Sequence, residues 1–318
     1  MSVLVYIESE NGIFKKAAFE VASYGRAVAN ALNTNLSAVV INAKDCNPLA
    51  TYGVDKVLSV SYSGQFNAKI YADILTQATQ KENSSVVILS SSADSRYLAP
   101  MLSVGLSAGY VPNVVEVPTS IQPFTVKRSV FSNKAFCTTE ITTEIKIIGL
   151  SNNSFGLVEQ SVSLEIVPFS PTLASSEITV EKVDKAVNKV SIADAETVVS
   201  AGRGLKGPEN WGMIEELADV LGAATACSKP VSDLGWRPHS EHVGQTGKPV
   251  ASNLYIAIGI SGAIQHLAGI NSSKVKVVIN TDPEAPFFKA ADYGIVGDAF
   301  EVVPKLNEKL KEFKLQNS

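Results

Sequence analysis

Residues 254–266 read Leu-Tyr-Ile-Ala-Ile-Gly-Ile-Ser-Gly-Ala-Ile-Gln-His, and this stretch decides the fold of the second half of the chain. It begins as an unbroken apolar run of strand length, which ends at Gly259. Such a run is typical of a strand that is buried on both faces of a parallel sheet. Free backbone N–H groups meet phosphates and cofactors where a parallel strand leads into a helix. We therefore predict a helix capped by Ser261, in which Gly262 and Ala263 present amides to a ligand.

The segments around this stretch repeat the alternation of strand and helix. Amphipathic spacing predicts helices at 209–221 and 300–313. Short apolar runs predict strands at 197–200, 223–226, 254–258, 275–279 and 293–296. This order predicts an α/β domain with a doubly wound parallel sheet of about five strands.

The first half of the chain shows a mixed pattern. Helical spacing at 17–32 and 67–79 alternates with strand-like runs at 3–7, 36–41, 56–60 and 86–89, which predicts another parallel sheet. After residue 113, runs rich in Val, Ile, Thr and Phe follow one another without long helical intervals. These runs predict an antiparallel extension of the sheet, and they cover 125–131, 135–143, 144–150 and 162–167.

A linker is expected between the two halves. Residues 168–188 carry two prolines, several Ser and Thr residues and clustered charge. We therefore place a domain boundary near residue 185, which gives domains at 1–185 and 186–318.

Composition excludes several classes of protein. The chain has 318 residues, 45% of them hydrophobic and 18% charged, and a net charge of −4 without a dense block of Lys and Arg. These values indicate a globular protein and argue against nucleic acid as the main ligand. Cys46, Cys137 and Cys227 are isolated, which favours neither a disulfide framework nor a zinc site. The N-terminus enters a strand at once, and no apolar run approaches the roughly 20 residues that span a bilayer, so we expect a cytoplasmic protein without direct membrane insertion.

Two glycine-bounded motifs add chemistry to the second domain. GRGLKG at 202–207 matches G-x-G-x-x-G between a predicted strand and helix. A common NAD site also needs an acidic residue about 20 positions later, but the chain has Cys227-Ser228-Lys229 there. The alternative interpretation of GRGLKG is a tight turn whose glycines only permit close packing. In VGQTGK at 243–248, Gln245 and Thr246 can donate and accept hydrogen bonds, although a surface turn would look the same.

The strand ends of the second domain carry further polar residues. His266 can donate a hydrogen bond or become cationic, although an isolated histidine is more often structural. A nucleophilic Ser261 would need His239 or His242 as a base, and its surroundings depart from the G-x-S-x-G elbow. Together, the Gly, Ser, Gln, His, Asn and Asp residues at five strand ends predict a site for a large, extended cofactor.

Four motifs together resemble the alpha subunit of electron transfer flavoproteins: GRGLKG at 202–207, VGQTGK at 243–248, LYIAIGISGAIQHLAG at 254–269 and INTDPEAPFFKAADYGIVGD at 279–298. The resemblance is dense over about 197–305 and weaker over the first domain. There, VKRSVFSNKAF at 126–136 departs from the family's Arg-Pro-x-Tyr-Ala-Gly-Asn-Ala segment. The resemblance implies an N-terminal mixed α/β domain of the nucleotide-hydrolase-like type and a C-terminal doubly wound FAD-binding domain.

The resemblance also implies the positions of site residues. Thr246 would lie near flavin N5 and His266 near the C2 carbonyl oxygen, with Ser261 toward the pyrophosphate. Lys229 replaces the family's usual arginine and so offers a compact ammonium in place of a planar guanidinium. The full set of expected FAD-binding residues is Arg203, Ser228, Lys229, Gln245, Thr246, Gly247, Ser261, Gly262, Gln265, His266, Asn280 and Asp298.

The resemblance further implies an electron carrier with no catalytic or metal-ligating residue of its own. Its N-terminal domain would contact an electron transfer flavoprotein beta subunit, which usually holds AMP. Electrons would come from dehydrogenases, such as the acyl-CoA dehydrogenases of fatty acid β-oxidation, and pass singly to a quinone oxidoreductase. A cation or a strong donor near N1 and the C2 carbonyl would raise the first reduction potential, and Lys229 and His266 are the candidates. An electron-bifurcating relative stays open, as do a nucleotide-binding regulator and an NAD enzyme of the sirtuin or deoxyhypusine synthase type.

Overall fold

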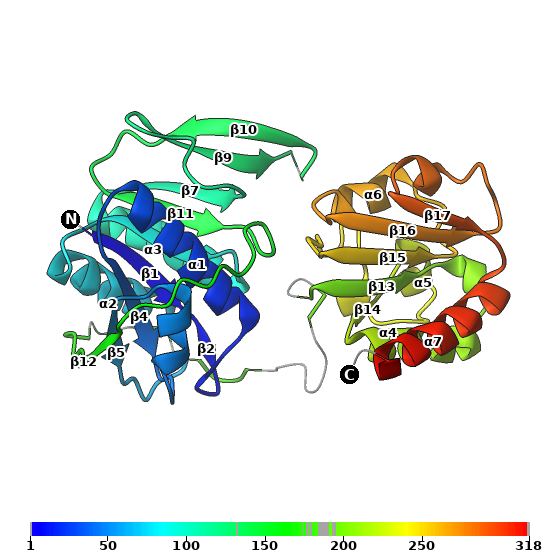
Figure 1. Cartoon of the computed structure of the whole chain (residues 1–318), viewed down its shortest axis with the longest axis horizontal. Helices are drawn as coiled ribbons and strands as arrows, with labels where there is room; N and C mark the ends of the chain where they lie inside the picture. Colours follow the sequence, from blue (N-terminus) through cyan, green and yellow to red (C-terminus); the bar gives the residue numbers. More distant parts are fainter. Residues whose placement is uncertain are drawn as a thin grey trace. The chain divides into compact units, whose positions relative to one another are not determined.

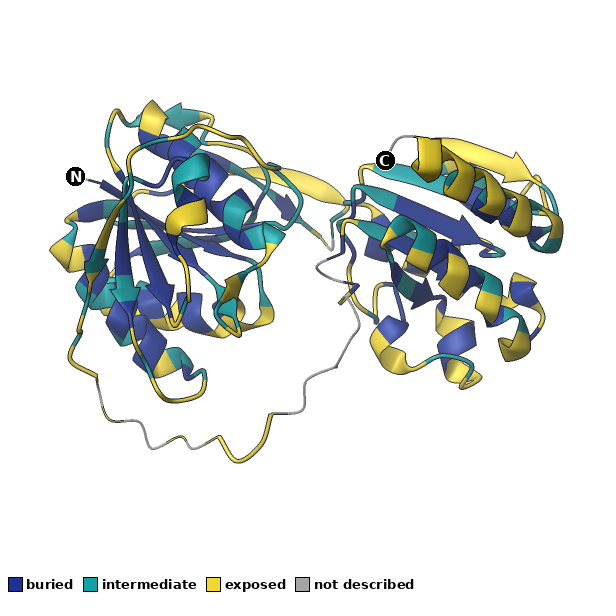
Figure 2. Ribbon diagram, turned by 60° about the horizontal axis from the view of Figure 1, so that its bottom comes forward, coloured by how far each residue is buried: buried dark blue, intermediate teal, exposed yellow. Residues whose placement is uncertain are grey.

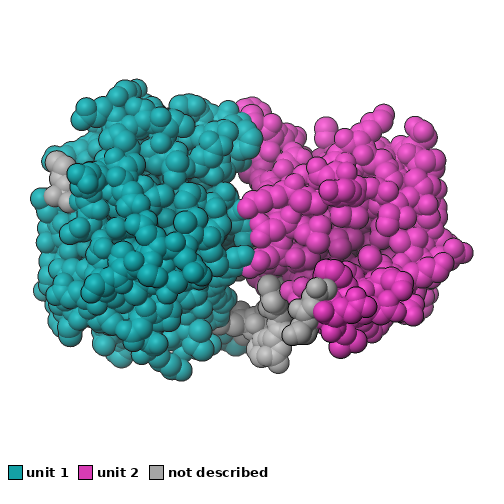
Figure 3. All heavy atoms as spheres, viewed as in Figure 1, with its two compact units in different colours: residues 1–130, 136–184 teal, residues 131–135, 185–318 magenta. Residues whose placement is uncertain are grey.

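The computed structural model describes residues 2–131, 133–173, 175, 178, 180–183, 191, 192 and 195–316. The chain divides into two compact units (Figure 3). Unit 1 comprises Met1–Val130 and Phe136–Asp184, and unit 2 comprises Phe131–Ala135 and Lys185–Ser318. Each unit has a main sheet and a core of its own.

The described residues of unit 1 build a ten-stranded sheet and three α-helices. A short hairpin, β2 and β3, and one 3-10 helix, η1, complete the unit (Figure 1). The elements are β1 (Ser2–Ile7), β2 (Ser9–Glu10), β3 (Ile13–Phe14), α1 (Lys16–Ala31), β4 (Leu36–Ile41), η1 (Asn47–Tyr52), β5 (Lys56–Val60), α2 (Ala68–Lys81), β6 (Ser84–Ser90), α3 (Ala93–Leu106), β7 (Gly109–Val114), β8 (Ser120–Ile121), β9 (Phe124–Val130), β10 (Ala135–Glu140), β11 (Lys146–Leu150) and β12 (Glu165–Pro168).

The sheet of unit 1 has β1 in its interior. The strand order is β10-β9-β7-β11-β6-β1-β4-β5-β12, and β8 pairs with β9. β1 runs parallel to both β4 and β6, and all six of its residues are buried. Helices cover both faces, because one core cluster contains α1 residues and the other contains α2 and α3 residues. The predicted mixed α/β fold is therefore correct.

Two of the runs predicted to be antiparallel are parallel strands. β11 lies between β6 and β7 and runs parallel to both, and β12 runs parallel to β5. Antiparallel pairs do form where β9 meets β7 and β8. The prediction failed for β11 because the chain leaves β7 and returns to the interior of the sheet, between β7 and β6. The buried run Ile147 to Leu150 is typical of an interior parallel strand.

The helices of unit 1 match the predicted segments except for α3, which sequence reasoning missed. The side chain of Asn67 caps α2 by accepting hydrogen bonds from the backbone N–H groups of Lys69 and Ile70. Ser92 caps α3 by accepting from Ser95 N, and Pro100 lies inside that helix. An internal proline is unfavourable in a helix, which explains why this segment gave no clear helical signal.

The start of the predicted linker belongs to unit 1. Pro168 ends β12, and the backbone of Thr172 exchanges two hydrogen bonds with the Gln77 side chain of α2. Lys69, also on α2, donates to the Ser175 carbonyl oxygen at 3.1 Å. The predicted boundary near 185 lies outside the described residues.

The described residues of unit 2 build a five-stranded sheet and four α-helices, with short 3-10 helices between them (Figure 1). The elements are β13 (Thr197–Ala201), η2 (Arg203–Leu205), η3 (Pro208–Trp211), α4 (Gly212–Leu221), β14 (Ala224–Cys227), α5 (Lys229–Asp233), η4 (His239–Glu241), β15 (Leu254–Ile258), α6 (Ile264–Ile270), β16 (Val275–Asn280), η5 (Pro286–Lys289), β17 (Tyr293–Val296) and α7 (Ala299–Gln316).

The five strands are all parallel, in the order β14-β13-β15-β16-β17, so the predicted doubly wound sheet is confirmed. One core cluster joins the sheet to α4 and α7, and the other includes α6 residues. Figure 2 shows that β13 and β15 are mostly buried, whereas β17 is exposed along its length. No helix in the described ranges is long and apolar enough to cross a membrane.

Candidate functional site

The carboxyl ends of the five parallel strands meet at one edge of the unit 2 sheet. From β13 the chain passes first to β14 on one side and later to β15 on the other, so the order reverses between β13 and β15. Ligands bind at such a reversal in open α/β sheets. The residues that follow the strands at this edge are Gly202, Ser228, Gly259, Thr281 and Gly297.

The glycines of GRGLKG serve backbone packing at this reversal. The N–H groups of Gly202 and Gly204 donate to the carbonyl oxygens of Ile258 and Gly259, at 2.9 and 3.1 Å. A Cβ atom on Gly204 would lie 2.6 Å from the Gly259 Cα, a separation that real Cβ atoms essentially never show. These N–H groups therefore have partners already, and the close-packing interpretation fits Gly202 and Gly204. Arg203, between them, is exposed.

The VGQTGK loop is fastened to α6. Gln245 N donates to the Gln265 carbonyl oxygen at 2.7 Å. Gly269 of α6 permits this contact, because a Cβ there would lie 2.6 Å from Gly244 N. Gln245, Thr246 and Gln265 are exposed, so the two motifs present their polar side chains together.

The predicted helix start at Ser261 is wrong. Helix α6 begins at Ile264, its N-cap is Ala263, and no side chain caps it. Gly262 has φ +87°, and a Cβ on it would lie 2.4 Å from Phe287 N, which itself donates to the Ser261 carbonyl oxygen. The chain must therefore turn around the Phe287 backbone before the helix can begin. Ser261 is exposed and does not cap α6, so the predicted arrangement, with the amides of Gly262 and Ala263 at a helix capped by Ser261, does not form.

His266 is the most deeply buried polar side chain of the predicted set, with an exposed fraction of 6%. Its Nε2 lies 2.9 Å from the hydroxyl oxygen of Tyr255, while its Nδ1 is buried and has no hydrogen-bond partner in the described ranges. Burial and the neighbouring His242 lower the pKa of His266 to about 4, although the nearby Val243 backbone, which makes no hydrogen bond to the buried Nδ1, partly opposes this. The imidazole is therefore neutral at pH 7 in the free chain and offers a hydrogen bond instead of a charge.

The exposed positive charges near the site come from Lys229 and Arg203. Lys229 begins α5 and forms an exposed ion pair with Asp233 at 3.1 Å. Such a pair contributes little to stability, so its ammonium group is available to an anion. Together with Arg203, it supplies positive charge at this edge.

The remaining predicted residues have local partners. Asn280 donates from Nδ2 to the Ile260 carbonyl oxygen at 3.1 Å, and Asp298 accepts from Phe300 N at 3.0 Å at the start of α7. Ser228 is buried, and Lys206 lies 3.8 Å from the Asp298 carboxylate. All twelve predicted residues lie at or shortly after the carboxyl ends of the strands, in the VGQTGK loop, or in η2, α5 and α6. The exposed ones are Arg203, Lys229, Gln245, Thr246, Ser261 and Gln265, and the others are Ser228, Gly247, Gly262, His266, Asn280 and Asp298.

His242 is a site residue that sequence reasoning assigned only to a hypothetical triad. It is 7% exposed, and its ring lies against Gly244 and Gly247, because Cβ atoms on them would be 3.4 Å from Nε2 and 2.9 Å from Nδ1. Burial and the charge of Lys229 lower the pKa of His242. The sequence signal that could have identified His242 is its position directly before the VGQTGK motif. The serine that contacts a histidine here is Ser232, whose Oγ is 2.7 Å from His239 Nδ1, so the geometry does not favour Ser261 as a nucleophile.

The arrangement fits an extended, anionic cofactor such as FAD. A buried, unpartnered nitrogen on His266 can receive a polar group of a ligand, while the exposed cations Arg203 and Lys229 can meet its anionic groups. No group of three His, Cys, Asp or Glu side chains in the described ranges could hold a metal ion.

Comparisons with known proteins agree with this geometry. A family model described as electron transfer flavoprotein domain matches residues 3–188, and one described as electron transfer flavoprotein FAD-binding domain matches residues 191–271. An electron transfer flavoprotein subunit alpha of Bacillus subtilis is 36% identical over 99% of both chains. The protein of the same name from Pseudomonas aeruginosa is 33% identical over 97% of this chain and 99% of its own. A mitochondrial one from Arabidopsis thaliana is 33% identical over 99% of this chain and 91% of its own.

Proposed function

This chain belongs to the electron transfer flavoprotein family, as an alpha subunit, and we propose that it holds FAD at the carboxyl edge of the unit 2 sheet and carries electrons between other proteins. The observation that carries this site assignment is the buried, unpartnered Nδ1 of His266 beside exposed polar groups on the VGQTGK loop and on α6, which a backbone hydrogen bond links. A large cofactor with both apolar and polar edges satisfies such a set.

The residues of the proposed site have different roles toward the cofactor. FAD supplies the redox chemistry when it is bound. His266, held by Tyr255, donates a hydrogen bond without adding charge, since its imidazole is neutral at pH 7. Lys229 is then the cation of the pair and would stabilise negative charge on the flavin ring.

The partners follow from the family. The N-terminal unit would join an electron transfer flavoprotein beta subunit that holds AMP, and the heterodimer would accept electrons from dehydrogenases, including acyl-CoA dehydrogenases. It would pass them singly to a quinone oxidoreductase or another acceptor. The absence of an acidic residue after β14, where Ser228 and Lys229 stand, supports FAD over a nicotinamide cofactor.

Co-expression with a beta subunit tests the proposal. We expect a yellow heterodimer with a flavin spectrum, one FAD and one AMP, which accepts electrons stepwise in a reductive titration. A colourless monomer that binds NAD would overturn the proposal, and two FAD molecules per heterodimer would point to the bifurcating relative.

The His266→Ala variant tests the site itself. We expect FAD to stay bound while the stepwise reduction potentials change, because the ring loses a buried donor. His239→Ala, which removes an exposed histidine, is the matched control. Unchanged potentials in His266→Ala would remove His266 from the proposed site.

A further inference from the structure

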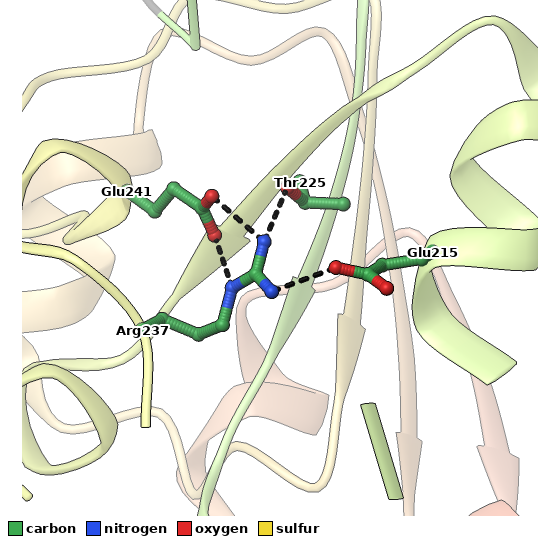
Figure 4. A network of polar contacts seen from close by, with 4 residues as sticks. All are labelled: Glu215, Thr225, Arg237 and Glu241. Carbon is green, nitrogen blue, oxygen red and sulfur yellow. Dashed lines mark hydrogen bonds and ion pairs between the residues drawn. The ribbon is translucent and has the colours of Figure 1, made fainter. Parts of the chain in front are cut away.

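Arg237 connects three elements of unit 2 beside the VGQTGK loop (Figure 4). Its Nε and Nη2 donate to the two carboxylate oxygens of Glu241, at 2.7 and 2.8 Å. Its Nη1 donates to Glu215 of α4 at 2.7 Å, and Nη2 also lies 3.4 Å from Thr225 Oγ1 of β14. The guanidinium further lies 5.4 Å from the centre of the Trp211 ring. One planar cation therefore joins η4 to α4 and β14.

Arg237 and Glu241 form a largely buried ion pair, whereas Glu215, the second carboxylate partner of Arg237, is exposed. The side chains of Arg237 and Glu241 are 13% and 7% exposed, whereas that of Glu215 is 50% exposed. Burial lowers the pKa of Arg237, but the hydrogen bonds and charges of Glu241 and Glu215 outweigh it and raise that pKa. If Arg237 is lost, the carboxylate of Glu215 can be hydrated by solvent, but the buried carboxylate of Glu241 cannot. Removing Arg237 would thus leave a buried carboxylate without its bidentate partner, which is strongly unfavourable.

Glu241 lies next to the backbone that shapes the VGQTGK loop. The following residue, His242, pairs with Cys227 at the end of β14, and Val243 N donates to the Cys227 carbonyl oxygen at 3.0 Å. The His242 carbonyl oxygen accepts from Lys248 N at 2.9 Å, which closes the loop. A displacement of Glu241 would therefore move both ends of the loop that presents Gln245 and Thr246.

We propose that Arg237 and Glu241 form a positioning pair that holds the VGQTGK loop in the shape required to bind the flavin. The pair acts through the loop and does not touch the cofactor. This inference rests on the proposed function, because it names the device that orients one wall of the same site.

A double-mutant cycle on FAD affinity tests the pair. The full chain is co-expressed with the beta subunit, FAD is removed, and rebinding is followed by flavin fluorescence. We expect Arg237→Met to weaken FAD binding by about tenfold or more, because it removes the bidentate partner of the buried Glu241 carboxylate. The second single variant, Glu241→Leu, should weaken FAD binding as well, because it leaves the largely buried Arg237 guanidinium without its bidentate acceptor. The combined Arg237→Met, Glu241→Leu variant removes both charges and should return to within about threefold of the wild type.

Two controls separate positioning from general stability. Arg237→Lys keeps the charge but cannot form the bidentate bond, so its FAD affinity should lie between those of the wild type and Arg237→Met. If Arg237→Met folds poorly, Arg237→Lys still tests the pair, because its FAD affinity should lie below that of the wild type. Lys311→Met breaks an exposed ion pair with Glu216 in the same unit, at 2.6 Å, and should leave FAD affinity unchanged.

The outcomes are distinct. If the Arg237 variants lower the unfolding midpoint of the FAD-free protein but leave FAD affinity unchanged, the pair is only structural and the inference is wrong. If the double variant is as weak as the two single effects added together, the residues do not act as a pair. If the wild-type heterodimer itself binds no FAD, the proposed function fails instead.

Discussion

Burial of His266 should make unit 2 lose stability as the pH falls. The pKa of this histidine drops from 6.5 to about 4 on folding, a difference of about 2.5 pH units. At about 1.4 kcal/mol per unit, this corresponds to about 3 kcal/mol of folding free energy. The sign follows from proton uptake. Above pH 6.5 both states are neutral, and between pH 6.5 and 4 only the unfolded state takes up the proton, so stability falls through this window and changes no further below it.

Tryptophan fluorescence can follow this effect in the full chain. Both tryptophans of the sequence, Trp211 and Trp236, lie in unit 2, so urea unfolding of the FAD-free protein monitored by their emission reports on that unit. Unfolding free energies are compared at pH 7 and pH 4.5 for the wild type and for His266→Gln. Carboxylates contribute a background that is common to both proteins, and the difference between the two proteins isolates His266.

We expect the loss of stability between pH 7 and pH 4.5 to be smaller in His266→Gln, by a large part of the about 3 kcal/mol. His242→Gln should reduce the loss as well, because burial and Lys229 also lower the pKa of His242. The reasoning is refuted if His266→Gln loses as much stability over this interval as the wild type.

Three further predictions concern stability and binding. Glu20→Gln should destabilise unit 1 by about 2 kcal/mol, because the Glu20 carboxylate accepts hydrogen bonds from three backbone N–H groups of residues 153–156. Urea unfolding followed by circular dichroism measures this loss, and an unchanged midpoint would contradict the prediction. Gly204→Ala should prevent unit 2 from reaching its native tryptophan emission, whereas Gly212→Ala, where a Cβ meets nothing within 4 Å, should be tolerated; equal behaviour of the two would refute the packing argument. Lys229→Arg should retain FAD, and loss of flavin absorbance in that variant would count against the placement of Lys229.

Local sequence predicted most elements because their signals are local. Residues 254–258 form an apolar run of strand length, and the structure places them as β15, parallel to both β13 and β16. The five predicted strand ends do meet at one edge, since parallel strands with crossover helices must all point the same way. The polar residues at those ends could therefore be placed at one edge of the sheet without knowledge of any contact.

Non-local contacts account for the failures. The run 144–150 follows other strand-like runs without a helix between them, which suggested antiparallel pairing, and only its insertion between β6 and β7 makes it parallel. Ser261 looks like a helix cap, but the Phe287 backbone, 26 residues later, delays the start of α6. The proline inside α3 obscured the helical pattern of this segment in the sequence, although the helix packs with α2 in one core cluster.

The sequence by itself determined the α/β class, the five strand ends and the polar residue types at those ends, because periodicity and glycine spacing act within a few residues. Only the tertiary structure decided what those residues can do. It buried His266 until its pKa fell to about 4, and it joined Arg237 to Glu241 and Glu215 across three elements. Charge state and loop position depend on burial and on partners distant in the sequence, and the fold alone creates both.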